Sequence, residues 1–134
     1  MGLLFSSQGQ RRVLELIVAQ KLSLRVYTND HEPTPATSLA DLVEPRGRTG
    51  YKPRTLDSGL WTIVESGDEG VASYAQYPKE VFQFDSPPLE LYGYFVQADD
   101  ETLMWAERFP DGPWKIKTAG SRAAITPRIE LEMS

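Results

Sequence analysis

Two neighbouring apolar runs decide the fold of this chain: Leu91-Tyr92-Gly93-Tyr94-Phe95-Val96 and Leu103-Met104-Trp105-Ala106-Glu107-Arg108-Phe109. The first run carries no charged residue, which is typical of a strand whose two faces are both covered. An acidic stretch, Ala98-Asp99-Asp100-Glu101, separates the two runs and is typical of a turn. The two runs therefore predict a central strand between two layers, followed by a turn into a second strand.

Shorter runs on either side of this pair predict further strands. Apolar and polar residues alternate in most of them, as they do in a strand with one buried face. The chain has 10 prolines and 10 glycines, which separate the runs. Roughly eight or nine strands at this spacing predict a mainly β fold, an antiparallel β-sandwich or jelly roll. The predicted strands are 22–27, 61–65, 71–77, 81–84, 91–96, 103–109, 114–117 and 125–132, with a weaker element at 39–43.

The two ends of the chain carry local sequence patterns of their own. Residues 1–8 are predicted to form an N-terminal arm, apolar at first and then polar, and residues 9–20 a short amphipathic helix. Ser7 and Gln10 have the spacing of a capping box at the start of that helix. Near the other end, Pro127 has no backbone donor, so the last strand should lie at a sheet edge or carry a bulge.

Composition limits the function classes that need to be considered. A chain of 134 residues favours a single domain, here 9–134. The absence of cysteine excludes disulfides, a thiolate nucleophile and a zinc–cysteine site. No apolar segment approaches the roughly 20 residues that cross a membrane, and the opening residues do not form a signal peptide. We therefore expect a soluble protein without a membrane partner.

Charge argues against nucleic acid as the primary partner. The formal net charge is −5, and an acidic surface repels phosphate backbones. Basic residues nevertheless gather locally in Arg46, Arg48, Lys52 and Arg54. One interpretation is a solvated loop beside acidic neighbours. The other is a docking stripe for an acidic protein partner.

No catalytic, cofactor-binding or metal-binding constellation is evident. The single histidine, His31, lies in a polar loop and is interpreted as structural. Strand alternation places Glu107 on one face with Leu103, Trp105 and Phe109, which predicts an inward carboxylate held by an ion pair or by backbone donors. The chain is therefore predicted not to be an enzyme.

The aromatic residues of the second half allow two interpretations. Packing in the core and between sheets is one, and a platform that stacks on a sugar or a peptide is the other. The residues concerned are Tyr92, Tyr94, Phe95, Trp105, Phe109 and Trp114.

The two apolar runs, with the continuation Pro110-Asp111-Gly112-Pro113, resemble a pattern of small structural proteins of tailed-phage virions. The likeness extends over most of the chain. It includes Leu24-Arg25-Val26-Tyr27-Thr28-Asn29-Asp30 upstream and Ile125-Thr126-Pro127-Arg128-Ile129 at the end. The charged stretch 44–54 and Pro87-Pro88 depart from the pattern.

The resemblance implies a virion component without enzymatic activity, assembled in the host cytoplasm. The apolar arm and the basic loop favour a capsid decoration (cement) protein. Leu3, Leu4 and Phe5 of the arm and the four basic residues of the loop would then contact the major capsid protein or neighbouring virion subunits. Homo-oligomers, such as trimers at local threefold positions, are expected. A tail, neck or baseplate component is the nearest alternative. A host-glycan-binding module and a small glycan hydrolase are alternatives of other classes.

Overall fold

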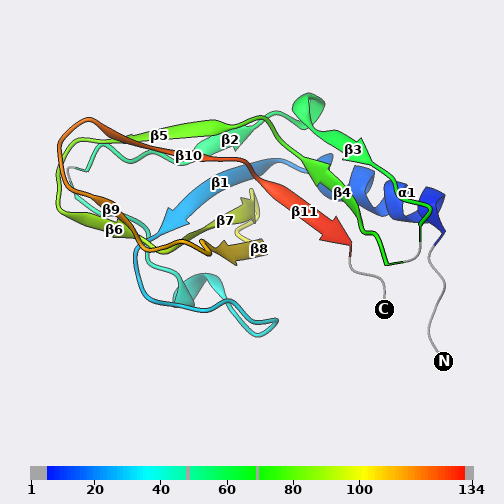
Figure 1. Ribbon diagram of the computed structural model, residues 1–134, viewed down its shortest axis with the longest axis horizontal. Coiled ribbons are helices and arrows are strands. Elements are labelled where there is room, and N and C mark those ends of the chain that lie inside the picture. Colours follow the sequence, from blue (N-terminus) through cyan, green and yellow to red (C-terminus); the bar gives the residue numbers. More distant parts are fainter. Residues whose placement is uncertain (1–5, 48, 69, 132–134) are drawn as a thin grey trace.

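The computed structural model describes residues 6–47, 49–68 and 70–131, and this part of the chain contains one α-helix and eleven strands (Figure 1). The helix α1 spans Ser7–Val18, and two short 3-10 helices, η1 and η2, span Leu39–Asp41 and Ser58–Leu60. The strands are β1 Leu22–Tyr27, β2 Arg54–Leu56, β3 Thr62–Val64, β4 Ser73–Gln76, β5 Glu80–Phe84, β6 Leu89–Leu91, β7 Gly93–Ala98, β8 Leu103–Arg108, β9 Trp114–Ile116, β10 Ser121–Ile125 and β11 Arg128–Leu131.

Residues 73–131 form one long hairpin that is folded on itself. Its tip is the acidic turn at 99–102, and its two arms pair in four successive rungs, β7–β8, β6–β9, β5–β10 and β4–β11. All four rungs are antiparallel. Pairs that mark the rungs are Gly93 with Arg108, Leu89 with Ile116, Glu80 with Ile125, and Ser73 with Leu131.

The hairpin tip joins the N-terminal strands to form the largest sheet, in the order β2-β1-β7-β8. This sheet lies opposite the β5–β10 rung, and the main core fills the space between them. The mainly β fold with antiparallel sheets and a single α-helix is thus confirmed, and it is consistent with a β-sandwich. The jelly-roll topology stays a prediction. Buried members of the main core are Leu22, Leu24, Val26, Leu56, Tyr77, Phe82, Phe84, Leu91, Tyr94, Val96, Ala98, Phe109, Ile116, Ala123 and Ile125.

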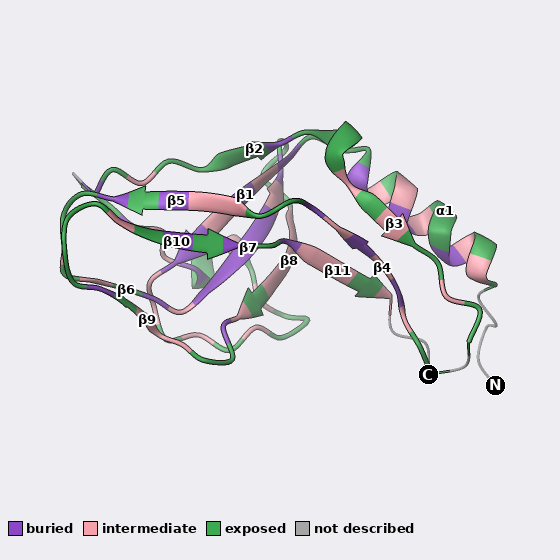
Figure 2. Cartoon of the chain, turned by 45° about the horizontal axis from the view of Figure 1, so that its top comes forward, coloured by how far each residue is buried: buried purple, intermediate pink, exposed green. Residues whose placement is uncertain are grey.

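Strand β7 is covered on both faces, as its apolar sequence predicts (Figure 2). Tyr94 and Val96 face the main core, whereas Phe95 packs with Tyr27 and Leu42 beneath the loop that follows β1. The predicted strand 91–96 is in fact two strands, because the chain turns between β6 and β7 at Tyr92.

Close packing explains why a glycine begins β7. A Cβ at Gly93 would overlap the backbone carbonyl of Glu107 and the hydroxyl of Tyr27. Any larger residue would therefore push β7 away from β8.

The prediction that Leu103 shares a face with Trp105 was wrong, because the β7–β8 pair contains a bulge. Val96 pairs with Trp105, but Gln97 pairs with Leu103, so Met104 is an extra residue in β8. Because of this extra residue, the side chains of β8 before the bulge point to the opposite face of the sheet from the one that simple alternation predicts. Trp105 therefore packs against the main core and Leu103 against the cluster on the other face of the sheet.

The helix end of the molecule consists of α1, the three-stranded sheet β11-β4-β3, the short helix η2 that precedes β3, and the connection between β3 and β4. Leu14 and Val18 of α1 pack against Ala75 of β4 in a small cluster of their own. The β4–β11 rung leaves the sandwich at Pro127, which is fully buried, and the Tyr77 N–H donates to the Pro127 carbonyl across the bend (3.0 Å). The sandwich body is the remainder of the described chain.

Several predicted boundaries were wrong. The helix begins at Ser7, within the predicted arm, and ends at Val18. It begins before the predicted residue because Ser6, rather than Ser7, is the N-cap, and the Ser6 hydroxyl accepts a hydrogen bond from the Gly9 N–H (3.1 Å). Gln10 is buried instead and accepts from the hydroxyl of Ser73.

The C-terminal prediction was partly right. Of the predicted strand 125–132, residues 128–131 form β11, which lies at a sheet edge as expected, whereas β10 was missed except for its last residue, Ile125. Strand β2 was missed, because its three residues follow the charged stretch without an alternating pattern.

Candidate functional site

Three connections meet at one end of the sandwich body, at the left of Figure 1. The N–H of Asp85, just after β5, donates to the Thr49 carbonyl (2.6 Å), and the N–H of Gly120 donates to the Phe84 carbonyl (2.7 Å). Gly50 has a φ of +78° and lies so close to Asp85 that a Cβ would overlap its carboxylate. The loop before β2 is therefore held against the β5–β6 and β9–β10 turns.

These connections and the start of β10 carry four exposed basic residues, Arg46, Lys52, Lys117 and Arg122, and we call this part of the molecule the basic end. The acidic Asp85 lies among them, and Glu90 lies opposite Lys115 across the β6–β9 rung, so those two charges offset each other. The end is thus net positive on a chain whose net charge is −5.

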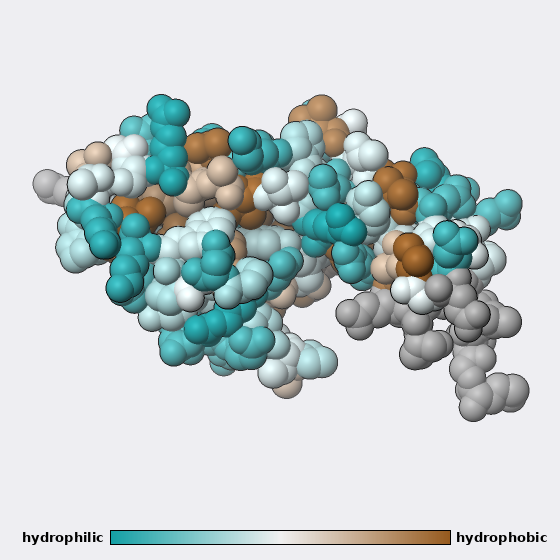
Figure 3. Space-filling view, in the orientation of Figure 1, coloured by the Kyte–Doolittle hydropathy of each residue, from teal (hydrophilic) through white to brown (hydrophobic). Residues whose placement is uncertain are grey.

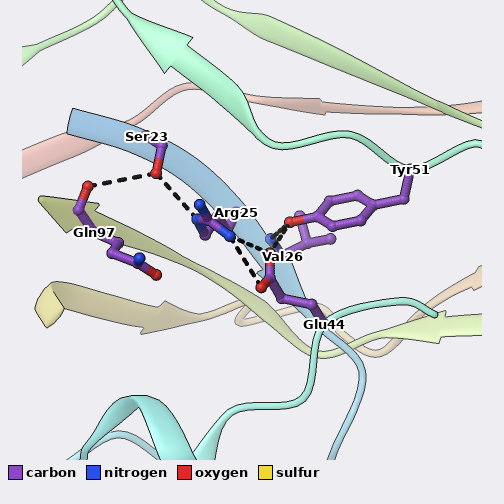
Figure 4. Close-up of polar contacts among 6 residues, drawn as sticks. All are labelled: Ser23, Arg25, Val26, Glu44, Tyr51 and Gln97. Carbon is purple, nitrogen blue, oxygen red and sulfur yellow. Dashed lines mark hydrogen bonds and ion pairs between the residues drawn. The ribbon is translucent and has the colours of Figure 1, made fainter. Parts of the chain in front are cut away.

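A partly buried polar network closes the base of the basic loop (Figure 4). Glu44 and Tyr51 flank the loop, and the Tyr51 hydroxyl donates to the Glu44 carboxylate. Arg25 also donates to both Glu44 oxygens, at 3.2 and 3.1 Å, and its Nε donates to Ser23 Oγ at 3.0 Å. Burial and the hydrogen bond to Glu44 raise the pKa of Tyr51 above its ordinary value of 10.0. The Tyr51 hydroxyl therefore keeps its proton at neutral pH.

The structure brings together only part of the predicted basic stripe. Arg46 and Lys52 lie at the basic end, but Arg54 is tied to β5, where its Nη2 donates to the Val81 carbonyl (2.6 Å) and its guanidinium lies over the Phe82 ring. Arg48 lies outside the described residues, as do Leu3, Leu4 and Phe5 of the predicted arm.

Sequence reasoning missed Lys117 and Arg122. They flank a turn, and only the long-range pairing of β10 with β5 places that turn beside the basic loop.

A second candidate site, which we call the interlayer cleft, lies between β8 and the β10–β11 segment. Its volume is about 620 Å³. At its base the Tyr94 hydroxyl donates to Glu107 Oε2 (3.0 Å) and accepts from the N–H of Arg128 (3.4 Å). Burial, reinforced by the negative charge of Glu107, raises the pKa of Tyr94. The lining residues are Tyr94, Trp105, Ala106, Glu107, Phe109, Trp114, Ala124, Ile125, Thr126, Arg128, Ile129 and Glu130.

Glu107 is exposed, so the prediction of an inward carboxylate was wrong. It lies on the core-facing side of the sheet, but the β10–β11 segment bends away there and leaves it open to solvent. Among the described residues no cation pairs with Glu107, and its partner is the Tyr94 hydroxyl. Glu130 forms an ion pair with Arg128 (2.7 Å), so the cleft does not present the two unpaired carboxylates typical of a glycoside hydrolase.

Aromatic rings form one wall of the cleft. The Phe109 and Trp114 rings are stacked, with centroids 3.6 Å apart and an interplanar angle of 4°. The indole N–H of Trp114 donates to Asp111 Oδ1 (2.8 Å), which fixes the ring in place. Trp105 meets Trp61 edge to face, with centroids 6.1 Å apart. The rings of this wall are therefore held by contacts with one another and with Asp111.

The polar loop after β1 has structural partners. His31 Nε2 lies 3.0 Å from Thr37 Oγ1, and the His31 carbonyl accepts from the Tyr27 hydroxyl (3.1 Å). Arg108 of β8 forms ion pairs with Asp30 and Glu32 of the same loop. Within the described ranges no group of three potential metal-ligating side chains occurs. No helix in that part of the chain has the length and apolar character needed to cross a membrane.

Comparison with known proteins found no matching family model, no matching curated protein and no matching solved structure. Function is therefore inferred from the residues of this chain and from the resemblance described above.

Proposed function

We propose that this chain is a non-enzymatic structural protein of a phage virion, and that it acts as a capsid decoration protein attached through its basic end. The observation that carries the proposal is that the connections packed together at one end of an acidic protein carry four exposed basic residues, Arg46, Lys52, Lys117 and Arg122. A cationic end favours an acidic partner and disfavours contact with other acidic surfaces.

Hydrogen bonds on both sides of residue 48 support the same proposal. Glu44 bonds to Tyr51 and Arg25, and the Thr49 carbonyl accepts from the Asp85 N–H. Segments that are held in place before binding lose little conformational entropy on binding. Many weak copies of such a contact can hold a shell together, because contacts within one assembly reinforce one another.

Contacts between copies are proposed at the helix end. The large exposed apolar residues of the described chain all lie there, and their exposure ranges from 39% to 62%. Figure 3 shows apolar surface at η2 and beside β3, as well as over the sandwich body. A second copy is the proposed partner, in a symmetric homo-oligomer such as a trimer. Leu3, Leu4 and Phe5 are proposed to add contacts to neighbouring subunits. The exposed apolar residues are Leu16, Leu60, Val64 and Val71.

The decisive experiment is the copy number of this chain in purified particles, measured by quantitative mass spectrometry against the major capsid protein. We expect a ratio near one to one, or a simple large fraction of it. A handful of copies would place the protein in the tail, neck or baseplate instead. Absence from the particle would contradict a virion role altogether.

Charge reversal tests the basic end directly. We expect Arg46→Glu combined with Lys117→Glu to weaken binding to undecorated shells by roughly tenfold or more at low salt, and added salt to weaken wild-type binding. Lys21→Glu combined with Lys79→Glu, at two exposed residues outside the basic end and the helix end, is the matched control and should bind normally. Equal losses in both variants would show that overall charge, rather than the basic end, controls attachment.

A further inference from the structure

We infer that the interlayer cleft binds an uncharged oligosaccharide, an activity separate from attachment to a shell. The cleft lies where the β10–β11 segment bends away from β8, so the sandwich body and the helix end each supply a wall. Its volume of about 620 Å³ lies within the usual range for small-ligand sites, which often occur at such junctions.

The aromatic wall supplies the apolar half of the recognition. Phe109 stacks on one face of the Trp114 ring, and Trp114, which is half-buried, is part of the cleft lining. Trp105 extends this wall along β8. A sugar ring has an apolar C–H face that packs on such a surface, and the bond from Trp114 to Asp111 orients the ring in advance.

Oxygen atoms opposite and below this wall supply the polar half. Glu107 Oε2 is bonded to Tyr94, whereas Oε1 accepts no hydrogen bond from a described residue. Thr126 adds an exposed hydroxyl from the β10–β11 connection. Carboxylate and hydroxyl oxygens pair well with the donor hydroxyls of a saccharide, and a bond to a carboxylate is stronger than one to a neutral acceptor.

The charge around the cleft selects among saccharides. The guanidinium of Arg128 is occupied by Glu130, Gln76 and the ring of Tyr74, over which it lies at 3.6 Å. The carboxylate of Glu107 is therefore left as the uncompensated charge of the lining. A uronic acid or a sulfated sugar would be repelled by it, so a neutral ligand is favoured.

The test uses the full-length protein on an array of immobilised neutral and anionic oligosaccharides, followed by calorimetric titration with the best neutral trisaccharide. We expect binding to neutral members alone. Glu107→Gln and Trp114→Leu should each weaken it by about tenfold. Glu65→Gln, an exposed carboxylate remote from the cleft lining, is the control and should change nothing. Circular dichroism confirms that each variant is folded.

Several results would overturn the inference. These are no binding on the array, binding to anionic members alone, or an affinity that neither cleft variant changes. Binding to an array of extended heptapeptides without binding to any saccharide would replace it with a peptide site. The decoration proposal is unaffected by these outcomes, because it is tested on shells with variants of the basic end.

Discussion

The sandwich body and the helix end share the same long hairpin, but they bury apolar residues to very different extents. In the body both layers contribute to one large cluster. At the helix end, Leu14, Val18 and Ala75 are the buried members of the small cluster, and the large exposed apolar residues of the described chain lie around it. The comparison shows a body with a large buried core, joined to an extension whose core is small and whose surface exposes large apolar residues.

Truncation of the body core should have the largest effect. Phe84 is fully buried between the layers, so Phe84→Ala removes its packing and leaves a cavity. We expect a loss of about 3–5 kcal/mol in the free energy of unfolding, measured by urea denaturation. A loss below about 1 kcal/mol would mean that the body does not dominate stability.

The same kind of truncation at the helix end should cost less and act locally. Leu14 is fully buried, but in the small cluster, so we expect Leu14→Ala to cost about 2–3 kcal/mol. Hydrogen exchange should quicken in α1, β3 and β4 and stay slow in β1 and β7. Equal acceleration everywhere would show that the two regions unfold as one unit.

Alkaline pH should weaken the body through its buried tyrosines. Burial raises the pKa of Tyr27 to about 12, and the pKa values of Tyr51 and Tyr94 are also raised. In the unfolded chain each hydroxyl ionises near its ordinary value of 10.0, so above that pH the unfolded state binds fewer protons.

The stabilisation is therefore complete below about pH 10 and declines as the pH rises towards the folded-state values. Each tyrosine should contribute a slope of about 1.4 kcal/mol per pH unit. Because the unfolded hydroxyl is only half ionised at pH 10, Tyr94→Phe should reduce the decline between pH 10 and 11 by about 1 kcal/mol, as measured by denaturation at a series of pH values. An unchanged slope would show that Tyr94 ionises freely in the folded protein.

The smallest effect on stability is expected at the exposed apolar residues of the helix end. Leu16→Gln combined with Val64→Thr should change the free energy of unfolding by less than about 0.5 kcal/mol. It should nevertheless shift the oligomeric state towards monomer, as measured by light scattering during size-exclusion chromatography. If the wild-type chain is monomeric under all conditions, contact between copies at this end is excluded.

The sequence was most informative where the pattern was strong and local. The apolar run around Phe95 and the alternation from Leu22 to Tyr27 predicted the two strands at the centre of the largest sheet. The cap at Ser6 was missed because neighbouring serines serve this role equally well, and only the burial of Gln10 distinguishes them.

The candidate sites depended more on distant contacts. The aromatic wall of the cleft could be named from the sequence, but its other wall exists because the chain bends at Pro127. The exposure of Glu107 follows from the same bend. At the basic end, Lys117 joins Arg46 only through the packing of turns on the end of β5.

The nested hairpin also constrains the order in which the protein can form. The β7–β8 rung closes the shortest loop, so it has the lowest entropic cost, and each outer rung becomes easier once the inner one is in place. Strand β1 is synthesised early, yet its central partner β7 emerges only after most of the chain. During synthesis the apolar face of β1 therefore stays exposed until β7 has been made. The nascent chain is thus most vulnerable to aggregation before its second half is complete.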